Sequence, residues 1–386
     1  MIAAMRAEYE LVVRRFGRLR SLELLDLHAV ADDVYESRFE DTDTNLTGVN
    51  VKVGDAAAVA VPRNNDSPEA NGWVGNAGRF LIPQTGTVLF AGSTNNFNNL
   101  TVASGTAQLG DAGTDNFSIT GTADVKSGAT LDVHTYTREV GSIAGVGSIT
   151  LGTGGALTVG SDNASTEFSG IMSDAGSFTK TGSGTLALSG GNTYSGATTI
   201  AGGMILVKLA SALNNTAVTV QNGGTLAVNF GVNLTHAATF DSGSTLGGNG
   251  TYTPGGTFGP TGVHIAPGLS VGTLTVGNNV DLHDLGVLDI QVDGASADLL
   301  QVTGNLTLGG SSVLNVTVLN PGTFTSIPIA TYTGSLIGTK FTTENLAGYS
   351  ISYDTPGQIL LLPEPATMAL LGLGALGMAF NRRRRR

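Results

Sequence analysis

Leucines recur at a constant spacing in the middle of this chain, and this spacing limits the folds that the chain can adopt. They stand at Leu186, Leu206, Leu226 and Leu246. Apolar and small polar residues alternate around each of them, as in the segment TLAV at 225–228. Alternation sends every second side chain to the same face of a β-strand. One short strand cannot bury its apolar face alone, so we expect the repeats to stack on one another.

Glycines between the predicted strands favour the same architecture. Glycine adopts the left-handed backbone angles that tight corners require. Coils of about 20 residues, each with two or three strands about 4.8 Å from the next coil, predict a parallel β-helix. A β-sandwich with regularly spaced strands is the alternative fold.

The composition agrees with an all-β chain. Of 386 residues, 56 are glycine, 13% are charged and 6% are aromatic, which is unusual for a globular enzyme rich in helices. Hydrophobic residues make up 41%, too many for a disordered chain. There is no cysteine, which excludes disulfides and thiolate metal sites.

The charges are unevenly distributed. The net charge is −11, and between residues 141 and 362 the only lysines and arginines are Lys180, Lys208 and Lys340. A nucleic-acid-binding surface needs clustered basic side chains. The sequence therefore predicts no nucleic-acid partner.

One repeat resembles a known family. The segment from Lys180 to Ile200 reads KTGSGTLALSGGNTYSGATTI. It resembles the autotransporter-associated β-strand repeat, a coil found in passenger domains that form right-handed β-helices. The resemblance near residues 180–207 implies a right-handed parallel β-helix, in which Tyr194 is a corner or core aromatic and Asn192 a turn or ladder residue. Residues 71–90, 267–274 and 298–302 resemble other parts of such passengers, so we predict a passenger-like domain at 71–360.

Three kinds of sequence follow one another near the C-terminus. Pro363, Glu364 and Pro365 form a tripeptide, residues 366–380 are apolar, and a basic block follows, made of Arg382, Arg383, Arg384, Arg385 and Arg386. The apolar run is about 22 Å long as a helix, shorter than the roughly 30 Å of membrane hydrocarbon. A short transmembrane helix that is processed explains this length better than a permanent span does. The basic block is expected to stay on the cytoplasmic side.

Residues 361–386 resemble the PEP-CTERM sorting signal of bacterial exported proteins. The resemblance implies that the tripeptide is the sorting and processing motif, read by an exosortase, and that residues 366–380 associate with the membrane. It also implies a location: inner-membrane-associated before processing, then at the cell surface or in the extracellular matrix. Exopolysaccharide is a further candidate partner.

Residues 1–70 form a charged region that does not fit a standard export signal. Its basic start is followed by a stretch that Glu23 and Asp26 interrupt, where a signal peptide needs about 7 to 15 apolar residues. We explain this region either by a misplaced start codon or by a divergent signal peptide. An unexported fragment is the third possibility for the chain.

Two patterns bear on catalysis. Residues 268–272 fit G-x-S-x-G, with Ser270 as nucleophile, His264 or His283 as base and Asp281 or Asp289 to orient it. That motif requires a strand followed by a helix, whereas the residues after it read as a strand. Carboxylates for glycoside hydrolysis would come from the densest acidic group, namely Asp281, Asp284, Asp289, Asp293 and Asp298. Such charges more often keep an exposed sheet soluble.

Metal and cofactor signals are weak. The five histidines lack metal-ligand spacing, and the segment from Asp41 to Lys52 fails as a calcium loop because Leu46 and Lys52 replace the required glycine and glutamate. We therefore predict no metal, no cofactor and no catalytic residue. The sequence favours a non-enzymatic, exported surface or matrix protein with an adhesive or structural role. A surface-exported, polysaccharide-degrading β-helix enzyme is the alternative.

Overall fold

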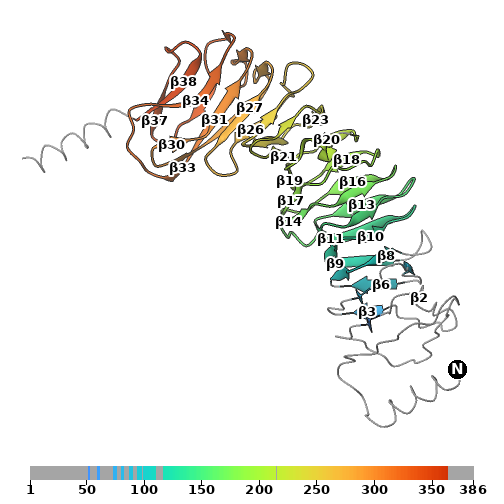
Figure 1. Cartoon of the computed structure of the whole chain (residues 1–386). Coiled ribbons are helices and arrows are strands. Elements are labelled where there is room, and N and C mark those ends of the chain that lie inside the picture. Colours follow the sequence, from blue (N-terminus) through green and yellow to red (C-terminus); the bar gives the residue numbers. More distant parts are fainter. Residues whose placement is uncertain are drawn as a thin grey trace, which may run out of the picture. The chain divides into compact units, whose positions relative to one another are not determined.

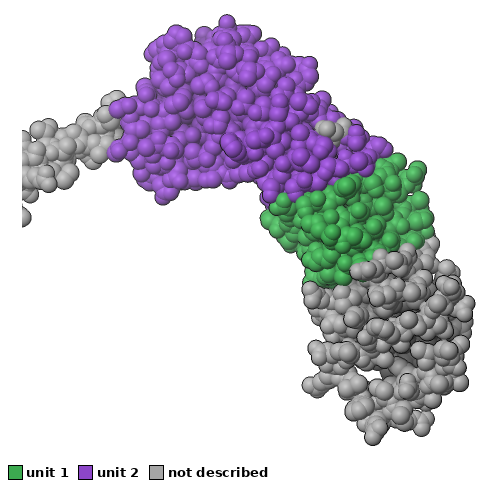
Figure 2. All heavy atoms as spheres, viewed as in Figure 1, with its two compact units in different colours: residues 1–177 green, residues 178–386 purple. Residues whose placement is uncertain are grey.

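The protein is described by a computed structural model (Figure 1). It describes residues 99–109, 118–213 and 215–363. For the other strand residues before residue 118, it describes only the backbone. The chain divides into two compact units, residues 1–177 and 178–386 (Figure 2). The predicted N-terminal region at 1–70 lies almost wholly outside the described residues.

Unit 1 is built from parallel strands that pair with strands of the next coil. One sheet contains β2 (Val59–Ala60), β5 (Thr87–Leu89), β8 (Gly105–Gln108), β10 (Ala129–Asp132), β12 (Ser148–Thr150) and β15 (Ile171–Ser173). A second contains β3 (Trp73–Gly75), β6 (Thr94–Phe97), β7 (Leu100–Val102), β9 (Asn116–Val125), β11 (Thr137–Gly145), β13 (Ala156–Val159) and β14 (Thr166–Phe168). β1 (Val51–Lys52) pairs with β4 (Phe80–Leu81).

Unit 2 is built in the same way, from parallel strands that pair with strands of the next coil. One ladder contains β16 (Ser177–Lys180), β18 (Thr198–Ile200), β20 (Val218–Val220) and β23 (Ala238–Phe240). The main ladder contains β17 (Thr185–Leu188), β19 (Gly203–Val207), β21 (Gly224–Val228), β24 (Thr245–Gly248), β26 (His264–Pro267), β29 (Val287–Asp293), β33 (Val313–Asn320) and β36 (Thr343–Asn345). A short 3-10 helix, η1 (Ala210–Leu213), follows β19.

Two further sheets close the coils of unit 2. The larger contains β22 (Asn233–Leu234), β25 (Thr251–Tyr252), β27 (Thr273–Val276), β31 (Leu299–Val302), β34 (Ile327–Tyr332), β38 (Gln358–Pro363) and β37 (Tyr349–Ser352). The smaller contains β28 (Val280–Asp281), β32 (Leu306–Thr307) and β35 (Leu336–Ile337). The parallel β-solenoid predicted from the repeat is confirmed, and the β-sandwich alternative is wrong.

The core of unit 2 is a column of aliphatic side chains, one from each of the first seven strands of the main ladder. Paired residues of adjacent strands stack directly on one another. The column is at most 2% exposed and contains Leu186, Ile205, Leu226, Leu246, Ile265, Leu288 and Leu314. Each member covers its neighbours from water, which explains why no single coil needs an apolar core of its own.

The leucine repeat is wrong by one position in its second coil. Leu186 pairs with Ile205, and Ile205 pairs with Leu226, so Ile205 is the inward residue. Leu206 pairs with Ala187 and Ala227 and is only half-buried. Both Ile205 and Leu206 are apolar, so alternation alone could not tell which one faces the core.

The coils become longer toward the C-terminal end. Paired residues lie 19 to 21 apart between β17 and β26, 23 apart between β26 and β29, 26 apart between β29 and β33, and 30 apart between β33 and β36. The strands lengthen as far as β33, since β24 and β26 have four residues, β29 has seven and β33 has eight, whereas β36 has three. The face of the main ladder is therefore not flat.

Near its end, the larger of these two further sheets contains a strand, β38, that runs in the opposite direction to both of its neighbours. β34 pairs with β38, and β38 with β37, in antiparallel fashion. Phe341, 1% exposed, is buried at this end. The last parallel strand of a sheet leaves one edge unpaired, and in this larger sheet β38 pairs with that edge of β34. Among the residues that the structure describes, no helix has the length and apolarity to cross a membrane.

Candidate binding groove and sorting motif

A groove with a volume of about 340 Å³ lies on the outward face of the main ladder of unit 2. Its floor contains Gly247 on β24 and Ala266 on β26, two positions with little or no side chain. Outward residues from β19 through β33 line it, so the groove crosses six neighbouring strands. We call this feature the ladder groove.

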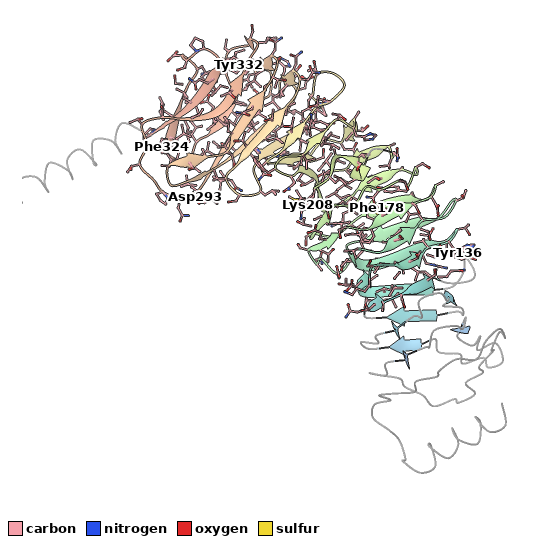
Figure 3. All side chains as sticks on the ribbon, in the orientation of Figure 1. Tyr136, Phe178, Lys208, Asp293, Phe324 and Tyr332 are labelled. Carbon is pink, nitrogen blue, oxygen red and sulfur yellow. The ribbon has the colours of Figure 1, made fainter. Side chains whose placement is uncertain are left out.

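One wall of the ladder groove is raised by a hairpin. β29 folds back into β30 (Ser296–Ala297), with Gly294 at a φ of 62° in the turn between them. Asp293 lies at the surface of this hairpin and accepts a hydrogen bond from Asn320 Nδ2 at 2.8 Å (Figure 3). Gln291 on β29 and Thr317 on β33 line the groove on this side. The longer coils thus place polar side chains beside a floor of small residues.

Asp298 joins the wall of the groove to the loop that precedes β27. Its Oδ2 accepts a hydrogen bond from Gln291 N at 2.8 Å, and its Oδ1 accepts one from Gly272 N at 2.9 Å. Asp298 N in turn donates to Gln291 O at 2.9 Å. Asp298 is 1% exposed, so these three bonds are made in a dry environment where they hold the hairpin firmly.

Burial raises the pKa of the Asp298 carboxyl to about 6, although the bonds from Gln291 and Gly272 act in the opposite direction. Because the folded pKa exceeds that of an unfolded aspartate, the folded state binds a proton more tightly. Asp298 then contributes stability that is complete below about pH 4 and lost as the pH rises through about 6. We expect the free energy of unfolding to fall by up to about 3 kcal/mol across this window.

Denaturant titrations at half-unit pH steps measure this effect. Asp298→Asn cannot ionise, so its unfolding free energy should lack the decrease between pH 4 and 6. It should also be less stable than the unchanged protein, since one amide oxygen replaces two carboxylate oxygens and a buried N–H loses its acceptor at about 1–3 kcal/mol. An identical pH profile in both proteins would contradict the assignment to Asp298.

A polar ladder continues from the groove toward the C-terminal coils. His264 Nδ1 lies 2.7 Å from Asp289 Oδ2, and Asn315 Nδ2 donates to Asp289 Oδ1 at 2.8 Å. Asn345 Nδ2 donates to Asn315 Oδ1 at 2.7 Å. These side chains come from four successive strands of the main ladder, so the repeat itself positions them. Asp289 is held by two partners and keeps further acceptor capacity on both oxygens.

The G-x-S-x-G segment at 268–272 has a structural role. β26 ends at Pro267, residues 268–272 form a loop, and β27 follows as a strand, so the strand-to-helix turn of a nucleophile elbow is absent here. Ser270 is exposed. Gly268 has a φ of +87°, and a Cβ at Gly272 would lie only 3.1 Å from Gly268 Cα and 3.3 Å from Asn249 Cβ, so both positions of the motif favour glycine. The structure does bring His264 and Asp289 together, as the catalytic interpretation required, but on the outward ladder.

The acidic group separates into different environments. Asp281 Oδ1 accepts from His283 N at 2.9 Å, and Asp284 lies 3.0 Å from His283 Nδ1. Only Asp289 and Asp298 line the same groove. Within the described part of the chain, no cluster of three or more His, Cys, Asp or Glu side chains is positioned to hold a metal ion.

The two residues singled out in the passenger-like repeat are structural. Tyr194 is 1% exposed, its hydroxyl lies 2.5 Å from Thr198 Oγ1, and burial raises its pKa to about 12. Its ring packs against Phe178, with centroids 6.3 Å apart. Asn192 Nδ2 donates to Ala212 O, one coil away, at 2.9 Å. The core and ladder roles predicted for Tyr194 and Asn192 are confirmed.

The sorting motif begins inside the folded body. Pro363 is the last residue of β38 and pairs with Tyr349 on β37. Glu364, Pro365, the apolar run at 366–380 and the basic block lie outside the described residues, so their roles stay predictions. The ladder groove was missed from sequence. Its only local signal is the small pair Gly247 and Ala266 at matching positions of adjacent coils.

Two family descriptions match this chain. Residues 178–207 match the Passenger-associated-transport-repeat, and residues 362–386 match the PEP-CTERM protein-sorting motif. Over 213 residues the chain is 31% identical to a protein named "Adhesin BmaC autotransporter" from Brucella suis biovar 1 (strain 1330). The matched region covers 54% of this chain and 5% of that adhesin.

These matches agree with the residues quoted for both resemblances. The chain spans only about one twentieth of the length of the adhesin it matches, so the likeness concerns a stretch of solenoid. A PEP-CTERM protein-sorting motif implies export to the cell surface. This chain is therefore a parallel β-solenoid that carries a passenger-type repeat at 178–207 and a PEP-CTERM sorting motif at 362–386.

Proposed function

We propose that this protein is a non-enzymatic, exported surface or matrix protein with an adhesive or structural role. The observation that carries the proposal is the combination, in one chain, of a sorting motif with a passenger-type solenoid. Similarity to a protein named as an adhesin supports the adhesive role. A stiff stack of coils suits that role, because it presents the same outward positions again and again along one face.

Sorting would depend on the C-terminal residues. In our proposal an exosortase reads Pro363, Glu364 and Pro365, residues 366–380 cross or enter the inner membrane, and the five arginines at 382–386 remain cytoplasmic. The protein is then inner-membrane-associated before processing and reaches the surface or matrix afterwards. Because Pro363 pairs with Tyr349 in the hairpin of β37 and β38, a cut beyond β38 leaves the end of the larger sheet intact.

Replacing the tripeptide by alanines tests the sorting step. We expect Pro363→Ala, Glu364→Ala and Pro365→Ala together to reduce the surface or extracellular fraction at least tenfold and to leave full-length protein in the membrane fraction. Fractionation of the native host, followed by mass spectrometry of the C-terminal peptide, measures both. The unchanged chain should yield a product that ends at or beyond Pro363.

A matched control separates sorting from folding. Pro356→Ala makes the same kind of change at an exposed proline just before β38 and leaves the tripeptide intact. It should be processed and located like the unchanged chain. Recovery of the intact basic block in the cytosol, or normal surface delivery of the triple variant, would contradict the proposal.

The outward faces of the coils support a binding rather than a catalytic role. Threonines stack in register on four adjacent strands of unit 2, namely Thr179, Thr199, Thr219 and Thr239. They recur once in each coil, with the same period as the core column. Such a column offers hydroxyl and methyl groups at a regular spacing of about 4.8 Å, which is recognition chemistry without a nucleophile or base.

The enzyme alternative would use the ladder groove. Two carboxylates with different environments line it, which is the arrangement that acid–base catalysis needs. Asp298, however, is 1% exposed, and both of its oxygens accept backbone hydrogen bonds. Its burial leaves only Asp289 of the two carboxylates accessible in the groove, which supports our choice of a non-enzymatic role.

A further inference from the structure

We propose that the ladder groove binds an uncharged polysaccharide chain along the axis of the solenoid. This inference rests on the proposed surface function and adds the class and the site of its ligand. Four properties of the groove carry it: its length, its size, the polar groups along its wall and its lack of positive charge.

The groove has the shape of a site for a chain. Its lining residues come from six neighbouring strands, β19 to β33, so it crosses five steps of about 4.8 Å and extends over about 24 Å. Its volume of about 340 Å³ is at the small end for ligand pockets and is spread over this length. A narrow, extended polymer fits these dimensions better than a compact ligand or the flat surface of a folded protein.

The chemistry of the lining suits sugar hydroxyls. Asp289, Gln291 and Thr317 form a polar wall, and Thr225 and Thr245 add hydroxyl groups from the earlier coils. Carboxylate, amide and hydroxyl groups accept and donate the hydrogen bonds that neighbouring hydroxyls of a sugar ring require. Leu269, which also lines the groove, is 46% exposed and supplies an apolar surface for the carbon face of a sugar ring.

The polar wall is preorganised. Asp298 holds the β29–β30 hairpin through Gln291 N, while His264 and Asn315 fix both oxygens of Asp289. Side chains fixed before binding lose little conformational entropy when the ligand arrives. Asp289 nevertheless retains lone pairs that could accept from a ligand hydroxyl.

The charge of the lining selects against acidic polymers. Of the described residues that line the groove, none is lysine or arginine, and two are aspartates. Lys180, Lys208 and Lys340 are the only lysines and arginines in the sequence between residues 141 and 362, and none lines the groove. A uronate or sulfated chain would therefore be repelled by the aspartates, with no cation in the lining to compensate. A neutral chain would not be repelled.

Affinity electrophoresis of the purified full-length chain tests this site. The gels contain galactomannan, xyloglucan or dextran as neutral probes, and alginate as the acidic probe. We expect at least one neutral probe to retard the protein and alginate not to. Ala266→Gln, which fills the floor of the groove from its outward side, should weaken retardation at least tenfold. Asp289→Asn should weaken it about three- to tenfold by removing a charged acceptor.

The matched control is Ala217→Gln, the same substitution at an exposed alanine outside the groove. It should bind like the unchanged chain, and both alanine-to-glutamine variants should unfold at the same denaturant concentration as the unchanged chain. Equal binding by Ala266→Gln, retardation by alginate alone, or no retardation by any neutral probe would overturn the inference. Release of reducing ends from a bound probe would instead favour the enzyme alternative.

Failure here is distinguishable from failure of the proposed function. Retardation is measured on purified protein, whereas sorting is measured by fractionation of the host. A protein that reaches the surface but binds no neutral probe would leave the sorting and surface proposal intact. A protein that binds a neutral probe but stays in the cytosol would support the binding site and contradict the sorting and surface proposal.

Discussion

Leu226→Ala is expected to lower the free energy of unfolding by about 3–5 kcal/mol, since it removes a fully buried leucine and leaves a cavity. Leu226 is 0% exposed and stacks between Ile205 and Leu246 in the core column. The coils on both sides lose contacts with it, so the surrounding structure has little freedom to collapse into the space. Denaturant titration followed by circular dichroism measures the loss.

Leu206→Ala is the matched control for this prediction. It is the same substitution at the preceding member of the leucine repeat, yet Leu206 points outward and is half-buried. Its cost should stay below about 1 kcal/mol, as at ordinary surface positions. Ile205→Ala should instead be as costly as Leu226→Ala. Equal losses for Leu206→Ala and Leu226→Ala would contradict the register of the second coil.

Gly268→Ala is expected to cost about 3 kcal/mol or more for two separate reasons. The backbone has a φ of +87°, a region that residues with a side chain rarely adopt. An added Cβ would also clash with Ser270 O and would lie 2.6 Å from Asp298 Oδ1. The loop around Asp298 would have to move, and the hairpin that forms the wall of the groove would lose its anchor. Denaturant titration measures this loss as well.

Two controls identify the cause of that loss. Gly256→Ala adds the same methyl group at a glycine where nothing lies within 4 Å of the new Cβ, and its effect should stay within about 0.5 kcal/mol. Ser270→Ala removes the hydroxyl of the G-x-S-x-G motif while leaving the loop intact, so it should change neither stability nor polysaccharide binding. A large effect of Ser270→Ala on any hydrolytic activity would restore the catalytic interpretation of that motif.

Part of the fold could be predicted because its signals are local. Alternation around Leu186 or Leu226 depends only on adjacent residues, and a constant period implies stacking whatever the partner strands are. Tyr194 and Asn192 were identified through a motif whose positions all lie within one coil. The sorting motif at 362–386 is likewise a continuous segment, so its recognition needs no tertiary structure.

The candidate site could not be predicted because its residues are distant in sequence. Ala266, Asp289 and Thr317 share a groove only because two successive coils of increasing length place them on neighbouring strands. Asp298 read as one of several surface carboxylates, yet the hairpin after β29 buries it. Nothing in the pentapeptide at 268–272 shows that its glycines serve this buried aspartate.

The amino-acid sequence by itself determined that this chain is a stack of short strands with a sorting motif, since alternation, period and motif are properties of continuous segments. Tertiary structure alone decided which residues face inward and which meet in the groove. In the second coil both Ile205 and Leu206 are apolar, and only pairing with Leu186 and Leu226 selects Ile205. The groove depends on register between coils in the same way, because register is set by the packing of neighbours and not by the local pattern of any one strand.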